Sequence, residues 1–148
     1  MKEYKERLSA LENMKITEKV CSECNRLLPI SEFDWNGHTN WKPKCRECEK
    51  EWYRQYRVNR GNERKAMTTD LKASVGCLLC GERVPLVLIF HHLDPATKYK
   101  NVATILNSKI ELINNELAKC VVLCRNCHTK VHAGILEVGD GPYPPLSI

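Results

Sequence analysis

Apolar residues along this chain fall in short runs, and the spacing within each run predicts a different element. Between residues 84 and 90 almost every position is apolar, which predicts a buried strand leading into His91. Residues 121–123, Val-Val-Leu, predict a second short strand. Residues 2–14 instead place apolar side chains at helical spacing among charged ones, which predicts a short amphipathic helix on Tyr4, Leu8, Leu11 and Met14.

A longer helix is predicted where Pro and Gly are absent. Residues 49–60 form such a segment, with Trp52 and Tyr56 on one face, and Gly61 is expected to end or bend the helix. The polar residues 62–75 then connect to the rest of the chain. We expect a domain boundary among them.

Turns and shorter elements fill the remaining segments. Apolar residues within 27–35, followed by the turn dipeptide Asn36-Gly37, predict a short hairpin. Mixed helical spacing between residues 98 and 119 predicts one or two short helices, and a last helix is expected from about Asn126. The Gly- and Pro-rich tail from Gly139 predicts disorder.

Nine cysteines change this picture, because eight of them form four Cys-x-x-Cys pairs. The first fifteen residues are charged and carry no secretory signal, so the pairs favour zinc in a reducing compartment over disulfides. Four thiolates complete a tetrahedral site, so His38 is predicted to be an exposed loop residue and not a metal ligand. Cys120, the ninth thiol, is predicted to be a small buried apolar residue. Two structural Zn²⁺ ions are predicted, one on Cys21, Cys24, Cys45 and Cys48 and one on Cys77, Cys80, Cys124 and Cys127.

The formal charge of +5 is concentrated in one segment of the chain. Residues 42–66 hold nine Lys or Arg against four Glu, so the remainder is neutral. Along the predicted helix the basic side chains either follow a nucleic-acid backbone through its phosphates or form the solvated flank of a linker helix. The candidate nucleic-acid-binding residues are Arg54, Arg57, Arg60, Arg64 and Lys65.

Four histidines accompany the second cysteine set. His91 and His92 end an apolar run, and adjacent side chains of a strand point to opposite sides. His128 and His132 are four residues apart and share one face of a helix. Since consecutive helical residues point about 100° apart, Cys127 can face a structural zinc while His128 faces a different metal. Eight thiolates already satisfy two zinc ions, which favours a catalytic role for the imidazoles over a structural one.

The order Cys-x-x-Cys, His-His at a strand end, then Cys-x-x-Cys-His-x-x-x-His resembles the HNH endonuclease family in its zinc-braced form. The resemblance covers Cys77 to His132. It implies a ββα-metal core that cuts or nicks double-stranded DNA with one catalytic Mg²⁺, Mn²⁺, Ni²⁺ or Zn²⁺. It further implies that His91 and His128 hold this metal and that His92 is the general base. His132 is then a third ligand or a contact to the scissile phosphate.

This chemistry suits the hydrolysis of a phosphodiester bond. A divalent metal neutralises charge on the phosphate and stabilises the leaving 3′ oxygen. A neutral histidine, with an ordinary pKa of about 6.5, can accept the proton of the attacking water. The four histidines therefore offer both functions that such a reaction needs.

Two further positions near these histidines have alternative roles. Asp94 either orients an imidazole or a metal-bound water, or forms a turn before Pro95. The middle Asn of the family stands nine residues before the helix histidine, and that position is Lys119 here. Lys119 either contacts a phosphate or is an ordinary surface lysine. Because of this departure, one alternative is a non-catalytic zinc protein that binds nucleic acid through a degenerate HNH site. A separate alternative is a ribonuclease or structure-selective nuclease.

The sequence as a whole predicts an α+β protein built from small zinc-stabilised modules. Its expected parts are an N-terminal helix with a four-cysteine zinc ribbon (1–48), a basic linker helix (49–75), an HNH nuclease domain with its own zinc (76–136) and a flexible tail (137–148). No segment is apolar enough to span a membrane, so a cytoplasmic protein is expected. Compact proteins with this resemblance are common in phages and mobile elements, which suggests a bacterial host cell or a phage-infected cell.

Overall fold

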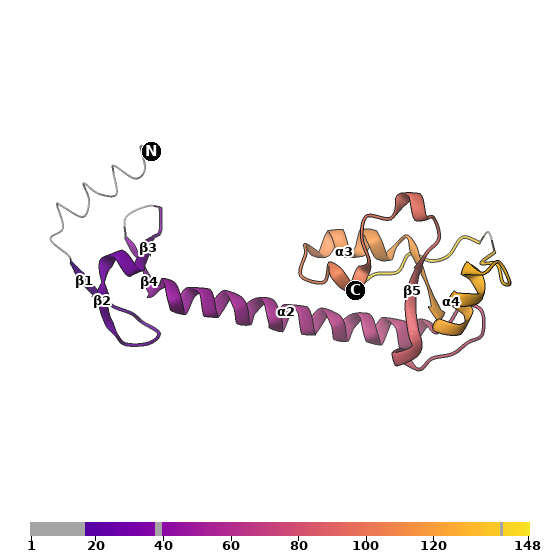
Figure 1. The fold of residues 1–148 in the computed structure, drawn as a ribbon, viewed down its shortest axis with the longest axis horizontal. Coiled ribbons are helices and arrows are strands. Elements are labelled where there is room, and N and C mark those ends of the chain that lie inside the picture. The colour runs from indigo at the N-terminus through magenta and orange to yellow at the C-terminus, as the bar shows by residue number, and fades with distance from the viewer. Residues whose placement is uncertain (1–16, 38–39, 140) are drawn as a thin grey trace. The chain divides into compact units, whose positions relative to one another are not determined.

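The computed structural model describes residues 17–37, 40–139 and 141–148, and in this part the fold is a small mixed α+β arrangement with short sheets (Figure 1). The predicted helix at residues 2–14 and His38 lie outside the described residues. The described residues contain three antiparallel pairs of strands: β1 (Glu18–Val20) with β2 (Leu27–Pro29), β3 (Phe33–Trp35) with β4 (Trp41–Cys45), and β5 (Leu88–His92) with β6 (Cys120–Cys124). The α-helices described are α2 (Arg46–Val75), α3 (Ile110–Leu117) and α4 (Arg125–His132). No helix among them has the length and apolar character that crossing a bilayer requires.

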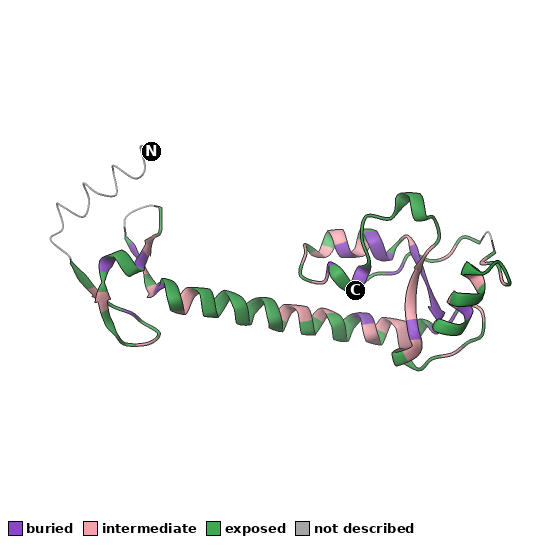
Figure 2. Ribbon diagram, viewed as in Figure 1, coloured by how far each residue is buried: buried purple, intermediate pink, exposed green. Residues whose placement is uncertain are grey.

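The chain divides into two compact units, Met1–Tyr56 and Arg57–Ile148. Each has its own core, as the buried segments in Figure 2 indicate. The core of the first unit is small and consists of Cys21, Ile30, Phe33, Trp41 and Cys45. The core of the second unit is larger and centres on Leu88, Ile113, Leu117, Val122 and Leu123.

Both units contain the same turn at their first Cys-x-x-Cys pair. The carbonyl of Cys21 accepts a hydrogen bond from Asn25 N at 3.0 Å, and the carbonyl of Cys77 accepts one from Gly81 N at 2.8 Å. The two donors have positive φ angles of 57° and 75°. Asn and Gly are the residues that adopt this left-handed conformation most readily, so the residue after each pair suits the turn.

Helix α2 continues through Gly61, so of the two predictions for this residue, an end or a bend of the helix, the end is wrong. A glycine in a helix costs about 1 kcal/mol relative to alanine but keeps every backbone hydrogen bond. A Cβ at this position would lie 3.1 Å from Nδ2 of Asn107, so the missing side chain allows the 107 loop to approach the helix closely. Residues 62–75, predicted to be a polar connection, form the rest of the same helix.

The apolar run of residues 84–90 is only partly a strand. Residues Pro85–Val87 form a 3₁₀ turn, and Leu86 is 84% exposed, so the prediction of a buried strand fails for this half. Proline lacks the N–H that a strand needs for pairing. Strand β5 therefore begins at Leu88 and ends at His92, as its pairing with β6 from Cys124 to Cys120 shows.

Residues 141–148, part of the predicted flexible tail, pack within the second unit. Leu146 is 8% exposed and belongs to the core, with Tyr143 and Ile148 packed against it. The side chain of Asn114 donates to the carbonyl of Ile148 at 3.2 Å and accepts from its N–H at 3.0 Å. Apolar side chains near the end of the chain thus outweigh the effect of its Gly and Pro residues.

Candidate functional site

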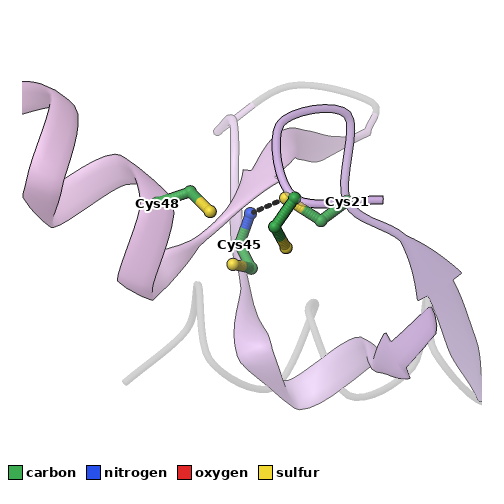
Figure 3. A group of neighbouring side chains, drawn as sticks. Cys21, Cys45 and Cys48 are labelled. Carbon is green, nitrogen blue, oxygen red and sulfur yellow. Dashed lines mark hydrogen bonds between the residues drawn. The ribbon is translucent and has the colours of Figure 1, made fainter. Parts of the chain in front are cut away.

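The first four-cysteine cluster joins the turn before β2 to the junction between β4 and α2 (Figure 3). The Sγ atoms of Cys21, Cys24, Cys45 and Cys48 all lie within 4.8 Å of one another. Four sulfurs around one zinc, at a Zn–S distance of about 2.3 Å, are about 3.8 Å apart, so this cluster fits a structural zinc.

Hydrogen bonds from backbone amides and from Arg26 favour the thiolate form of two cysteines in this cluster. The N–H of Cys45 donates to the Sγ of Cys21 at 3.3 Å, the contact drawn in Figure 3. The N–H groups of Cys24 and Cys45 lower the pKa of Cys21 to about 6, and the Arg26 side chain, donating at 3.3 Å, lowers the pKa of Cys24. Thiolates are the form that binds zinc, so these contacts favour a metal ion.

The second cluster has the same composition. The Sγ atoms of Cys77, Cys80, Cys124 and Cys127 also lie within 4.8 Å of one another, and those of Cys80 and Cys124 are 3.7 Å apart. Cys124 caps α4, since its Sγ accepts from Cys127 N at 3.4 Å. The predicted grouping of the pairs is confirmed, and both clusters could hold structural metal ions such as zinc.

Three of the four predicted site histidines form a third cluster. Their ring nitrogens come within 4.8 Å of one another, with His91 on β5 and His128 and His132 on α4. The Nε2 atoms of His128 and His132 are 3.2 Å apart. Two nitrogens on one tetrahedral metal, each about 2.0–2.1 Å from it, are separated by about 3.4 Å. The arrangement thus fits a metal ion held by all three imidazoles.

Burial favours the neutral imidazoles that such a site requires. Burial, followed by the charges of the neighbouring histidines, lowers the pKa of His91. The pKa of His128 is lowered by burial first and by His132 second. Neutral imidazole is the form that binds a metal, so proton competition at these two positions is weak.

His92 faces away from this cluster and contacts a buried acid. Its Nε2 lies 3.2 Å from Oε2 of Glu116 on α3, and the two side chains are 8% and 1% exposed. Burial alone would raise the pKa of Glu116, but hydrogen bonds from Lys119, His92 and two backbone amides lower it to about 2. Glu116 is therefore a buried carboxylate beside the predicted general base.

Glu116 was not among the residues identified from the sequence. It precedes Leu117 and follows Ile113 by three positions, so it lies at the buried side of the helix Ile110–Leu117. A carboxylate at such a position normally has buried partners, because an unpaired buried charge is very costly. A glutamate at the buried side of a helix was therefore the feature of the sequence that could have identified this residue.

The two residues with alternative roles near the histidines, and the ninth cysteine, can now be placed. Asp94 has the turn role, since its carboxylate accepts from Ala96 N at 2.8 Å at the start of the Pro95–Thr97 turn. Lys119 donates to the carbonyl of Thr97 at 2.9 Å and to Glu116, so it is neither a simple surface lysine nor directed at a ligand. Cys120 is 2% exposed, which confirms the prediction, and burial raises its pKa to about 12.

A cavity of about 590 Å³ adjoins His92 within the second unit. Lys65, Thr68 and Lys72 of α2 line one side, and Val102 and Thr104 are among the residues on the other. Burial, with the charge of Lys65, lowers the pKa of Lys72, and its ammonium donates to the carbonyl of Leu88 at 3.1 Å. The cavity is therefore bordered by two basic side chains.

The predicted nucleic-acid-binding flank is only partly available for phosphates. Arg60 and Arg64 donate to backbone carbonyls of residues 106–108, including Leu106 O at 2.8 Å, so they hold a loop of their own unit. Arg54 pairs with Glu51 at 2.9 Å. Within the described residues, Arg57 and Lys65 are exposed and form no ion pair.

Aromatic side chains are exposed on the N-terminal half of α2. The rings of Trp52 and Tyr56 stack with centroids 5.6 Å apart and an interplanar angle of 8°, which confirms that they share a face. Tyr53 contacts the Trp52 ring edge to face, and the three side chains are about half exposed. Lys44 lies 5.8 Å from the centroid of Trp52.

Comparisons of this chain with models of protein families, with curated protein sequences and with solved structures find no match. The function is therefore inferred from the residues themselves. The relevant features are two four-cysteine clusters, a cluster of three histidines, and His92 paired with the buried Glu116.

Proposed function

We propose that this protein is a metal-dependent HNH-type DNA endonuclease or nickase that hydrolyses phosphodiester bonds. The observation that carries the proposal is the convergence of His91, His128 and His132 on one point, with His92 as the next residue along the strand. Each four-cysteine cluster could hold a structural metal ion with its own four thiolates, so a metal on these imidazoles would be a separate centre.

The elements that supply the site support the ββα-metal assignment. Strands β5 and β6 are antiparallel neighbours, and α4 begins directly after β6. The histidines come from the end of the first strand and from the helix. A structural metal on Cys124 and Cys127 would fix the strand–helix junction and thereby the direction of His128 and His132.

Each histidine has a role that follows from its surroundings. His91, His128 and His132 would hold a divalent ion, which when bound supplies charge neutralisation at the phosphate and stabilisation of the leaving oxygen. His92 accepts the proton of the attacking water, as the lone pair of a neutral imidazole can. Lys65 and Lys72, beside His92 at the cavity, supply positive charge for the substrate backbone.

The test is cleavage of supercoiled plasmid in the presence of Mg²⁺, Mn²⁺, Ni²⁺ or Zn²⁺. We expect the wild type to produce nicked or linear DNA with at least one of these ions. The His92→Ala variant should cleave about 10² to 10⁴ times more slowly, the usual contribution of a positioned acid or base. Cleavage by His92→Ala at the wild-type rate would contradict the role of His92.

The second candidate is a zinc protein that binds nucleic acid without cutting it. The observation that favours it is the small exposure of the His92 side chain, 8%, since a general base must reach water. This protein would shift DNA in a gel and lose that binding at high salt, yet leave the plasmid intact with every ion. The same plasmid experiment therefore separates the two functions.

A further inference from the structure

The carboxylate of Glu116 is surrounded by hydrogen-bond donors. Oε2 faces His92 Nε2 at 3.2 Å, Tyr99 N at 3.1 Å and Lys100 N at 3.5 Å, while Oε1 accepts from the ammonium of Lys119. The Glu116 side chain is 1% exposed, so the hydrogen-bond donors to its two oxygens come from the protein and not from solvent. A protonated acid would place its own hydrogen against these donors, so Glu116 is an ionised acceptor.

An ionised acceptor determines which nitrogen of His92 carries hydrogen. The carboxylate can only accept, so Nε2 must be the donor in the 3.2 Å contact. Neutral imidazole carries one hydrogen, and this leaves the lone pair on Nδ1. A carboxylate that fixes an imidazole in this manner sets both its tautomer and the orientation of its ring.

We propose that Glu116 is the positioning residue of the site, which holds His92 with Nε2 protonated so that Nδ1 is the atom that accepts the proton of the attacking water. This inference rests on the proposed function and names a residue that the function alone does not require. In the proton transfer, a water O–H bond breaks and an Nδ1–H bond forms, while the oxygen keeps the electron pair with which it attacks phosphorus. As the new P–O bond forms, the P–O3′ bond breaks and the 3′ oxygen leaves with its electron pair. Glu116 stays ionised throughout and faces the imidazolium that results.

Lys119 belongs to the same arrangement. It stands three residues after Glu116, neutralises the carboxylate, and its ammonium also binds the carbonyl of Thr97 at 2.9 Å. Its own carbonyl accepts from Leu93 N at 3.0 Å, directly after His92. The pair of Glu116 and Lys119 thus joins the loop of residues 93–100 to α3, and His92 precedes that loop.

The first test is the tautomer of His92 in the folded wild-type protein, read from side-chain ¹⁵N chemical shifts. We expect Nε2 protonated and Nδ1 unprotonated while the ring is neutral. In Glu116→Gln, which is checked for folding by its zinc content and amide spectrum, this preference should weaken. The Nδ1-protonated tautomer in the wild type would overturn the proposal, and this result needs no variant to fold.

The second test separates positioning from a merely structural role. Glu116→Gln should lower the kcat of plasmid cleavage by about 10- to 100-fold with little change in KM, the usual effect of losing a group that orients a site residue. Glu111→Gln, at an exposed position of the same helix, is the matched control and should leave the rate unchanged.

The substitution is then repeated in a His92→Ala background. If Glu116 acts through His92, Glu116→Gln has little further effect there, because the group it positions is gone. An equal loss of rate in both backgrounds would overturn the proposal and leave Glu116 as a residue of the fold.

Failure of this inference can be distinguished from failure of the proposed function. If the wild type cleaves DNA but His92 is protonated on Nδ1, the nuclease function stands and the role of Glu116 is wrong. If the wild type cleaves nothing, the nuclease function fails and the positioning role falls with it, even where the tautomer is as expected.

Discussion

The two units contain the same strand–helix corner with different residues around it. In the first unit β4 ends at Cys45 and α2 begins at Arg46, and in the second β6 ends at Cys124 and α4 begins at Arg125. In both, the second cysteine of the pair lies in the first turn of the helix. The residues paired with the strand cysteines are Phe33 and Leu88, which are 0% and 1% exposed.

The corners differ at the position after the second cysteine. Glu49 follows Cys48 and pairs with Lys42 at 2.7 Å, whereas His128 follows Cys127 and joins the histidine cluster. The first corner folds around its cysteines with no imidazole in the described part of its unit. The same strand–helix corner is thus present with either glutamate or histidine after the second cysteine.

Loss of a metal-binding cysteine should have the largest effect and should remain within one unit. Cys45→Ser should unfold the first unit and Cys124→Ser the second, because structural zinc contributes on the order of 10 kcal/mol to folding in small modules. Amide spectra of the two variants, with zinc content, check this. Loss of both sets of signals in either variant would show that the units do not fold separately.

Loss of the histidine after Cys127 should change function and leave the corner intact. His128→Ala should keep both zinc ions and its fold, lose most affinity for an added divalent ion, and cleave DNA at least about 10²-fold more slowly. Calorimetric titration of the zinc-loaded protein measures the affinity. Glu49→Ala, the equivalent change in the first corner, is the control and should alter neither quantity.

The tail gives the second unit packing that lies outside its corner. Leu146→Ala should lower the free energy of unfolding of this unit by about 2–4 kcal/mol, since it removes a buried side chain and leaves a cavity. Denaturant unfolding followed by signals of each unit measures the difference. An unchanged midpoint for the second unit would contradict the packing of this segment.

Basic residues of α2 should show the smallest effects, of two different kinds. Lys50→Ala and Arg57→Ala change exposed side chains, and each should lower the slope of log K for DNA against log salt by up to about one unit. Arg64→Ala should instead lower the stability of the second unit, because Arg64 holds residues 106–108. A larger change of salt slope for Arg64→Ala than for Arg57→Ala would reverse these roles.

The sequence predicts which cysteine and histidine side chains cluster as candidate metal ligands better than it predicts the packing around them. Cysteine pairs and the His128–His132 spacing are local signals, because a knuckle turn or one turn of helix brings the members together. They correctly predicted the two four-cysteine clusters and the helical positions of the histidines. The extended conformation of His91 and His92 likewise follows from the apolar run before them.

Three other features that depend on distant partners were not predicted. The role of Glu116 requires α3 to pack beside the end of β5, and the burial of Leu146 requires the tail to return to Asn114. Arg64 was a candidate for phosphate contact or for a solvated helix flank, since nothing in its neighbourhood along the chain indicates the carbonyls of Leu106 and Ser108. In each case the deciding contact joins segments that are remote in the sequence.

In the proposed function, a metal held by the three histidines is the one that supports cleavage. The most direct test compares two titrations of the zinc-loaded protein with Mn²⁺: occupancy of the added ion, and the rate of plasmid cleavage. We expect both to reach half-maximum at the same Mn²⁺ concentration, and both to shift upward together in His132→Ala. Saturation of the histidine site without cleavage, or cleavage in His132→Ala with an unchanged midpoint, would contradict this role of the histidines.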